Sequence, residues 1–304
     1  MTKAFEMQGL VPAVFSPMKA SGAVDLNPIA PVTEQLIQEG VKGLYICGST
    51  GEGPCLSREE RMEITKAYIS AVSGRIPTVV QVGHQSIPEA QRLAEHAAAN
   101  GADAISAIPP NYFKPSSLDV IIEMMAEIAS AAPDVPFYYY NIPSVTGVQV
   151  DLLRFLEEGA EKIPNLVGAK YSHSTVYELQ ACLEAQGGRF DLLFGTDEML
   201  LSALVVGVKG AVGSTYNFAA PLYNRIIAAF NSGDLETAKH LQAKAAQMVR
   251  VLVAHGGNPA IKAMMALLGV DCGGTRLPQK ALSGTQLDAL KGDMTAIGFF
   301  DWGR

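Results

Sequence analysis

Short apolar runs alternate with longer amphipathic segments through most of the chain. Eight runs are rich in apolar or β-branched residues, most of them bounded by Gly, Pro or Asn, and each precedes a segment of helical period. The runs cover residues 10–15, 43–47, 78–82, 104–108, 136–140, 166–170, 192–194 and 210–212, and the helices begin near residues 28, 57, 86, 117, 150, 174, 197 and 219. Strands that are each followed by a helix predict a parallel sheet.

The runs lack strict alternation of apolar and polar residues, which indicates strands that are covered on both faces. Eight such units in about 230 residues match a closed (β/α)8 barrel, the TIM barrel, and an open doubly wound sheet is the alternative. Residues 234–255, 259–268 and 285–297 then show helical patterns without a further strand. The sequence therefore predicts a catalytic barrel domain, residues 1–232, and a C-terminal helical extension, residues 233–304.

Composition and charge exclude several classes of protein. Of the 304 residues, 48% are hydrophobic and 17% are charged, which suits a globular protein with a sizeable core rather than a disordered chain. The net charge is −7, so neither nucleic acid nor an anionic membrane is expected as a partner. No apolar run approaches the roughly 18 residues that span a bilayer, and no targeting segment is visible.

Cysteine and histidine spacing also limits the possible chemistry. Cys47, Cys55, Cys182 and Cys272 form no CxxC pair, which favours reduced thiols and a cytoplasmic location. The five histidines show no metal-binding spacing, so no metal is expected. Two roles stay open for Cys47 and Cys55, which are packing and an oxidation-sensitive thiol.

In a TIM barrel the active site lies at the C-terminal ends of the strands, so the residues after each run are the candidates. After the second run, residues 48–53 read Gly-Ser-Thr-Gly-Glu-Gly. This glycine-rich turn offers backbone amides and the hydroxyls of Ser49 and Thr50 to a carboxylate or phosphate. The alternative is a tight strand-to-helix connection, because the turn lacks the Gly-Lys-Ser/Thr of a phosphate-binding loop.

The fifth and sixth runs end in residues that can move protons or attack a carbonyl. Tyr138 and Tyr140 point to the same side of the fifth strand, where they either pack or, for Tyr140 at the strand's end, shuttle a proton. Lys170 ends the sixth run at the barrel mouth. It is either an ion-pair partner at the rim or an amine nucleophile that forms an imine with a ketone.

The seventh and eighth runs are followed by short polar residues. Gly195, Thr196, Asp197 and Glu198 follow the seventh run, and the acidic pair either caps a helix or binds a ligand. Ser214 lies in the Gly-Ser-Thr-Tyr-Asn segment after the eighth run, which suits a helix cap or substrate hydroxyls. No Ser, His and Asp arrangement indicates a hydrolase.

Together these segments resemble the family of pyruvate-dependent class I aldolases that contains N-acetylneuraminate lyase and dihydrodipicolinate synthase. The resemblance spans most of the chain and rests on four segments in family order and spacing. They are residues 48–52, residues 140–147 (Tyr-Asn-Ile-Pro-Ser-Val-Thr-Gly), residues 168–170 and residues 213–217. The details are closer to the lyases, because Val145 stands where the synthases carry an Arg that grips a second carboxylate.

The resemblance implies roles for these residues in the cleavage of a sialic acid to pyruvate and N-acetylmannosamine. Lys170 would form the Schiff base and Tyr140 would move the proton, without a cofactor. The carboxylate would lie on Ser49 and Thr50. The remaining substrate-binding residues implied by the resemblance are Ser172, Gly195, Asp197, Glu198, Ser214 and Tyr45, together with Tyr112, which would reach into a neighbouring subunit of a homotetramer.

Two other functions remain open at this stage. One is a related aldolase or synthase, acting on 2-keto-3-deoxy sugar acids, 4-hydroxy-2-oxoglutarate or the dihydrodipicolinate precursors. The other is a catalytically silent barrel that binds a keto acid, since a fold can keep its pocket and lose its chemistry. Retention of both Lys170 and Tyr140 favours an enzyme.

Overall fold

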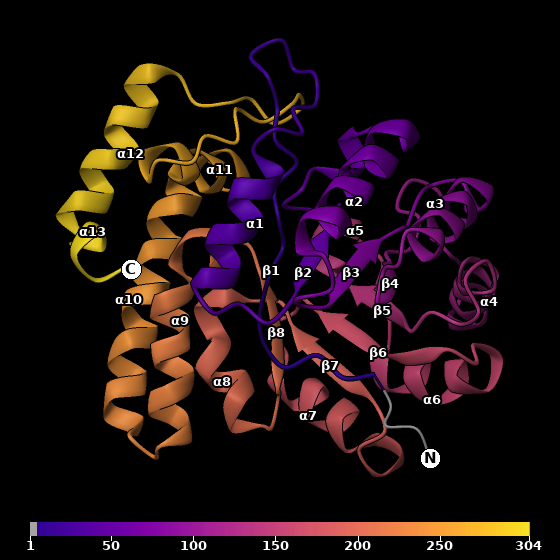
Figure 1. Ribbon diagram of the computed structural model, residues 1–304. Helices are drawn as coiled ribbons and strands as arrows, with labels where there is room; N and C mark the ends of the chain where they lie inside the picture. The colour runs from indigo at the N-terminus through magenta and orange to yellow at the C-terminus, as the bar shows by residue number, and fades with distance from the viewer. Residues whose placement is uncertain (1–4, 304) are drawn as a thin grey trace.

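The computed structural model describes residues 5–303, and within them eight parallel strands form the centre of the molecule (Figure 1). The strands are β1 (Gly9–Pro12), β2 (Leu44–Ile46), β3 (Thr78–Gln81), β4 (Ala104–Ala107), β5 (Phe137–Asn141), β6 (Leu166–Tyr171), β7 (Asp191–Phe194) and β8 (Gly210–Gly213). From β2 to β8 each strand pairs in parallel with the next in sequence, and β8 pairs in parallel with β1. A single bridge between Ala13 and Tyr45 closes the ring. The predicted (β/α)8 barrel is confirmed.

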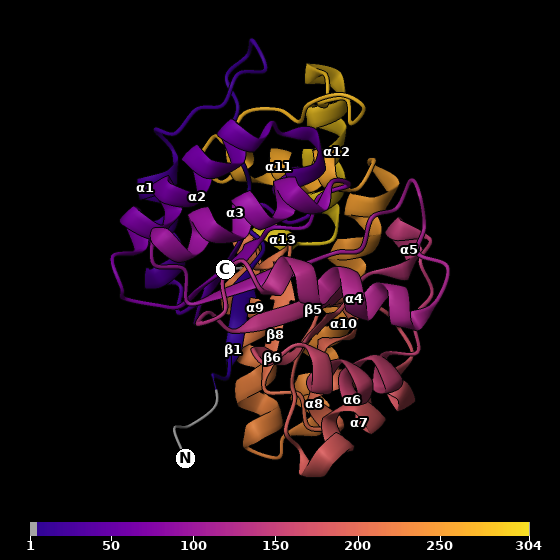
Figure 2. The ribbon, with the colours of Figure 1, turned by 90° about the vertical axis from the view of Figure 1, so that its right-hand side faces the viewer.

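Helices connect the strands and surround them. The helices of the barrel are α1 (Ile29–Gln38), α2 (Arg58–Val72), α3 (Ile87–Ala99), α4 (Leu118–Ala129), α5 (Pro143–Thr146), α6 (Leu152–Lys162), α7 (Val176–Glu184), α8 (Leu200–Val205) and α9 (Tyr216–Asn231). Short 3-10 turns lie at Gly53–Cys55, Ala185–Gly187 and Asp197–Met199. Figure 2 shows α2, α3, α4 and α6 following one another around the outside of the strands.

Side chains that point inward from the strands fill the barrel. This interior cluster is separate from the larger core between strands and helices, and it contains Met7, Val11, Ala13, Tyr45, Val79, Ala104, Tyr138, Tyr140, Leu193 and Val212. Alternation along β5 places Tyr138 and Tyr140 inside, whereas Tyr139 points outward and packs against Phe155 of α6. The interior of the barrel is therefore a packed core and not an open channel.

Four more helices follow the barrel and lie on one side of it (Figure 1). They are α10 (Leu235–Ala254), α11 (Asn258–Leu267), α12 (Gly284–Ala296) and α13 (Phe299–Trp302), of which α13 had no sequence prediction. The side chains of Asp234 and Ser283 cap α10 and α12, and α10 packs against α8, α9, α11 and α12. The boundary at residue 232 stays a prediction. Across residues 5–303, no helix has the length and apolar character needed to cross a membrane.

Candidate active site

Lys170 lies inside the barrel near the carboxyl end of β6, paired in register with Tyr140 of β5. Its side chain is buried, with 3% of the residue exposed. The Nζ atom lies 4.0 Å from the ring centroids of both Tyr45 and Tyr140, whose rings meet edge to face at 5.8 Å. These two aromatic faces hold the amine in place and attract its positive charge. This position agrees with the sequence prediction that Lys170 lies at the barrel mouth, where the sixth strand ends.

Tyr140 is placed so that its phenolate is stabilised. Burial alone raises the pKa of Tyr140, but the positive charge of Lys170 and hydrogen bonds from Ser49, Lys170 and Ser172 outweigh it. The pKa of this phenol is therefore lower than its ordinary value. The Ser49 Oγ and Tyr140 Oη atoms lie 3.4 Å apart. Tyr140 is thus suited to accept a proton near Lys170.

Tyr45, the other tyrosine beside Lys170, is held as a neutral phenol. Its hydroxyl donates to the Oγ of Ser106 at 3.2 Å, and burial raises the pKa of Tyr45 well above its ordinary value. The ring packs on Gly48, where a Cβ would lie 2.7 Å from a ring carbon. Tyr45 therefore forms a wall behind Lys170 and the glycine-rich turn.

The two acidic residues after β7, Asp197 and Glu198, have different surroundings. The Oδ2 atom of Asp197 accepts hydrogen bonds from the Thr215 amide (2.8 Å) and the Thr215 hydroxyl (2.6 Å), so this carboxylate holds the loop after β8. A Cβ at Gly213 would lie 2.0 Å from the other Asp197 oxygen, so only glycine allows this approach. Glu198 stays at the cavity edge. Burial raises the pKa of both carboxyl groups.

A cavity of about 410 Å³ opens above Lys170 and gathers nine of the residues predicted from sequence. These are Ser49, Thr50, Tyr140, Lys170, Ser172, Gly195, Asp197, Glu198 and Ser214. The other two predicted residues do not line the cavity: Tyr45 is buried behind Lys170, and Tyr112, in the segment after β4, is 80% exposed beside Phe113. Within the described residues, Lys170 is the only lysine or arginine that lines the cavity.

Sequence reasoning missed several residues of the cavity wall. His173 is the second residue after β6, next to the predicted Ser172, so its position at a strand end was a signal that could have found it. Thr215 shares its hydroxyl between Asp197 and Tyr223, a role that needs the folded loop to be seen. Val249 of α10 and Ile261 of α11 reach the cavity from the C-terminal helices, and no local signal marked them.

The donors in this site do not form a metal centre. No group of three or more His, Cys, Asp or Glu side chains among residues 5–303 is arranged to hold a metal ion. The polar side chains of the cavity carry hydroxyls, two carboxyls, one imidazole and one amine, a set that suits a hydroxylated ligand with one carboxylate and one carbonyl.

Comparisons with known proteins agree with this arrangement. The model of the dihydrodipicolinate synthetase family matches residues 6–297. The N-acetylneuraminate lyase of Rattus norvegicus is 40% identical over 282 residues, which cover 91% of this chain and 88% of the relative. The solved N-acetylneuraminate lyases of Aliivibrio salmonicida (41% identity, 97% and 98% of the two chains) and Proteus mirabilis (37%, 97% and 100%) superpose with TM-scores of 0.94. The resemblance inferred from the motifs is confirmed, and this chain belongs to the dihydrodipicolinate synthetase family.

Proposed function

We propose that the protein is an N-acetylneuraminate lyase, a class I aldolase that reversibly cleaves N-acetylneuraminate to pyruvate and N-acetylmannosamine. The observation that carries the proposal is the buried Lys170 amine between two tyrosine rings, beneath a cavity lined by hydroxyls and carboxyls. The lyase names of the relatives support it.

The chemistry begins at Lys170, whose neutral amine adds to the C2 ketone of the open-chain sugar acid. The Tyr140 phenolate frees this amine by taking one proton from the Lys170 ammonium, and it returns that proton to the carbinolamine hydroxyl, which leaves as water and gives the protonated imine. The Ser49 and Thr50 side of the cavity holds the carboxylate. The iminium keeps a positive charge where the ammonium lay, so the neighbouring Tyr140 phenolate stays stabilised.

Tyr140 then takes the proton of the C4 hydroxyl while the C3–C4 bond breaks. The electron pair of that bond passes into the iminium and forms an enamine, and the aldehyde of N-acetylmannosamine leaves. Protonation of the enamine at C3 and hydrolysis of the imine release pyruvate and restore Lys170. Glu198, Ser172 and Ser214 face the hydroxylated tail.

The charges around the cavity favour a substrate whose remaining part, beyond the pyruvate portion, is a neutral polyol and not a second carboxylic acid. A synthase acting on a second carboxylate needs a cation for it, but Val145 is 64% exposed and lies outside the residues that line the cavity. Asp197 and Glu198 add negative charge instead. A neutral sugar tail fits this balance.

The proposal includes a homotetramer in the cytoplasm. Tyr112 and Phe113 are 80% and 85% exposed, which supports an interface on this face, with Tyr112 completing a neighbouring site. The four cysteines are free thiols, which supports a reducing compartment. Sedimentation of wild-type protein beside Tyr112→Ala tests the assembly, and a monomer in both samples would overturn it.

The first test of the activity is pyruvate release from N-acetylneuraminate, followed by coupling to lactate dehydrogenase. We expect release by the wild type, none by Lys170→Ala, and unchanged release by Lys239→Ala, a surface lysine paired with Glu236. Near-normal cleavage by Lys170→Ala would exclude the imine mechanism. Release from 2-keto-3-deoxy sugar acids alone would keep the chemistry and overturn the substrate.

A further inference from the structure

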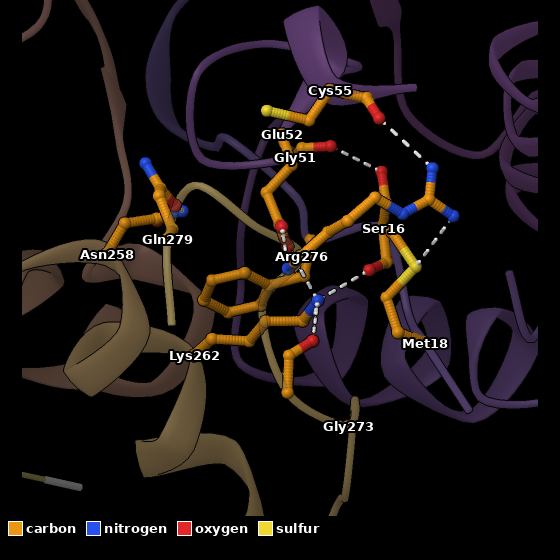
Figure 3. A network of polar contacts seen from close by, with 12 residues as sticks. Ser16, Met18, Gly51, Glu52, Cys55, Asn258, Lys262, Gly273, Arg276 and Gln279 are labelled. Carbon is orange, nitrogen blue, oxygen red and sulfur yellow. Dashed lines mark hydrogen bonds and ion pairs between the residues drawn. The ribbon is translucent and has the colours of Figure 1, made fainter. Parts of the chain in front are cut away.

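A buried ion pair lies beneath the glycine-rich turn, outside the residues that line the cavity (Figure 3). The Lys262 Nζ and Glu52 Oε1 atoms are 2.8 Å apart, and each side chain is only 1% exposed. Lys262 belongs to α11, more than two hundred residues away in sequence from the turn. Burial of two charges is costly unless both are fully hydrogen-bonded, so this pair calls for a specific role.

Both partners of the pair are hydrogen-bonded. The Lys262 ammonium also donates to the backbone carbonyls of Ser16 and Gly274, both at 2.8 Å, which uses all three of its protons. The other oxygen of Glu52 accepts the backbone amide of Arg276 at 2.7 Å. The pair therefore joins three parts of the chain: the segment after β1, the glycine-rich turn and the segment after α11.

These contacts fix the half of the turn that follows Ser49 and Thr50. Glu52 has a φ of 55°, a left-handed conformation that is strained in a residue other than glycine and needs contacts to hold it. Its amide donates to the Ser49 carbonyl at 3.1 Å. The Ser16 hydroxyl donates to the Gly51 carbonyl at 2.6 Å, and a Cβ at Gly51 would lie 2.8 Å from the Val14 carbonyl oxygen. The turn is held on both sides of Thr50.

From these contacts we infer that Lys262, acting through Glu52, positions the glycine-rich turn to receive the substrate's carboxylate, an inference that rests on the proposed function. Lys262 is a positioning residue, because it touches the turn and not the cavity. Without its ammonium, the buried Glu52 loses its partner and the left-handed turn loses its anchor. Ser49 and Thr50 then meet the carboxylate in a wider range of positions.

Reductive trapping of the Lys170 imine tests this role with two ketones. Pyruvate carries the carboxylate that the turn would bind, and acetone lacks it. In Lys262→Met we expect the half-saturating pyruvate concentration for borohydride trapping to rise about tenfold, as loss of a charge-assisted contact implies. Trapping by acetone should stay within about twofold of wild type, and the KM for cleavage should rise more than kcat falls.

Two further variants complete the design. Glu52→Gln keeps the shape and a polar contact to Lys262 but removes the charge, so it should show a smaller rise in the same direction, and it serves if Lys262→Met does not fold. Glu60→Gln is the matched control, because it breaks the neighbouring Arg276–Glu60 ion pair and leaves Glu52 untouched. We expect the control to trap pyruvate as the wild type does.

Each outcome decides between the role proposed here and the alternatives. Unchanged pyruvate trapping in both Lys262→Met and Glu52→Gln overturns the positioning role, and so does an equal loss with acetone, which indicates general damage to the barrel. If the wild type traps neither ketone, the proposed function falls and this inference falls with it.

Discussion

Two tyrosines of β5, two residues apart and both inside the barrel, meet opposite electrostatic surroundings. Tyr140, at the carboxyl end, lies beside the Lys170 amine, and its pKa is lowered. Tyr138, at the amino end, donates to the Oδ2 atom of Asp191 at 2.5 Å, and burial together with that carboxylate raises its pKa well above the ordinary value. The carboxyl end of the barrel, its mouth, stabilises a phenolate at Tyr140. The amino end, its floor, stabilises a neutral phenol at Tyr138.

The difference comes from the charges that β6, the neighbour of β5, and β7, one strand further round the barrel, present to the two tyrosines. β6 brings a cation to the mouth, and β7 begins with an anion at the floor. Asp191 also accepts a hydrogen bond from the Met7 amide at 2.9 Å, which fixes the N-terminal segment at the amino end of the barrel. One residue type therefore lies beside a cation at one end of the strand and beside an anion at the other.

The largest effect should follow from removing the phenol at the mouth. Tyr140→Phe takes away the proposed proton acceptor and keeps the ring against Lys170 and Tyr45. We expect kcat for cleavage to fall by about 10² to 10⁴, the usual contribution of a positioned acid or base, with little change in thermal stability. Steady-state kinetics and thermal melting measure both quantities. A loss below about fivefold would remove Tyr140 from the proton transfer.

Asp191→Asn should remove a pH dependence that the floor gives to stability. Burial raises the pKa of Asp191 to about 6 from 3.8, against opposing hydrogen bonds from Met7 and Tyr138. Because the folded protein holds this proton more tightly, its contribution to stability is present below about pH 4 and is lost as the pH rises through 6. The shift corresponds to about 3 kcal/mol.

Urea unfolding at several pH values between 4 and 8 measures this effect as a difference between the two proteins. The free energy of unfolding of Asp191→Asn, relative to wild type, should rise between about pH 4 and pH 6 and level off at higher pH. Other titrating groups cancel in the difference. A flat difference would mean that Asp191 titrates in the folded protein as it does in the unfolded chain.

Local sequence patterns predicted the barrel because most of its strands and helices are marked by their own residues, as apolar runs or as capping side chains. Apolar runs fixed the strands to within a few residues, and helix starts such as Arg58 and Leu118 follow the capping serines Ser57 and Ser117. The short helix α5 (Pro143–Thr146) was missed, since four residues carry no period. The start of β7 at Asp191 was missed because a buried carboxylate at a strand end breaks the apolar pattern.

The candidate site was predictable where its residues lie at strand ends. The strand-end rule and the family motifs located Lys170, Tyr140 and the glycine-rich turn. Contacts between distant segments left no local trace, and so Lys262, which reaches the turn from α11, was not found. Asp197 was found, but its hold on Thr215 depends on the folded loop after β8.

The smallest effect should come from removing the phenol of Tyr138 at the amino end of the barrel. Tyr138→Phe removes one donor from the buried Asp191 carboxylate and keeps the ring in the barrel core. Loss of a hydrogen bond to a charged group costs about 1.5–3 kcal/mol, so the urea midpoint should fall while kcat stays within about twofold of wild type. The cost should shrink below pH 5, where Asp191 is protonated and the bond becomes one between neutral groups. A drop in kcat as large as that of Tyr140→Phe would show that the two ends of β5 are coupled, and that the floor takes part in the chemistry of the mouth.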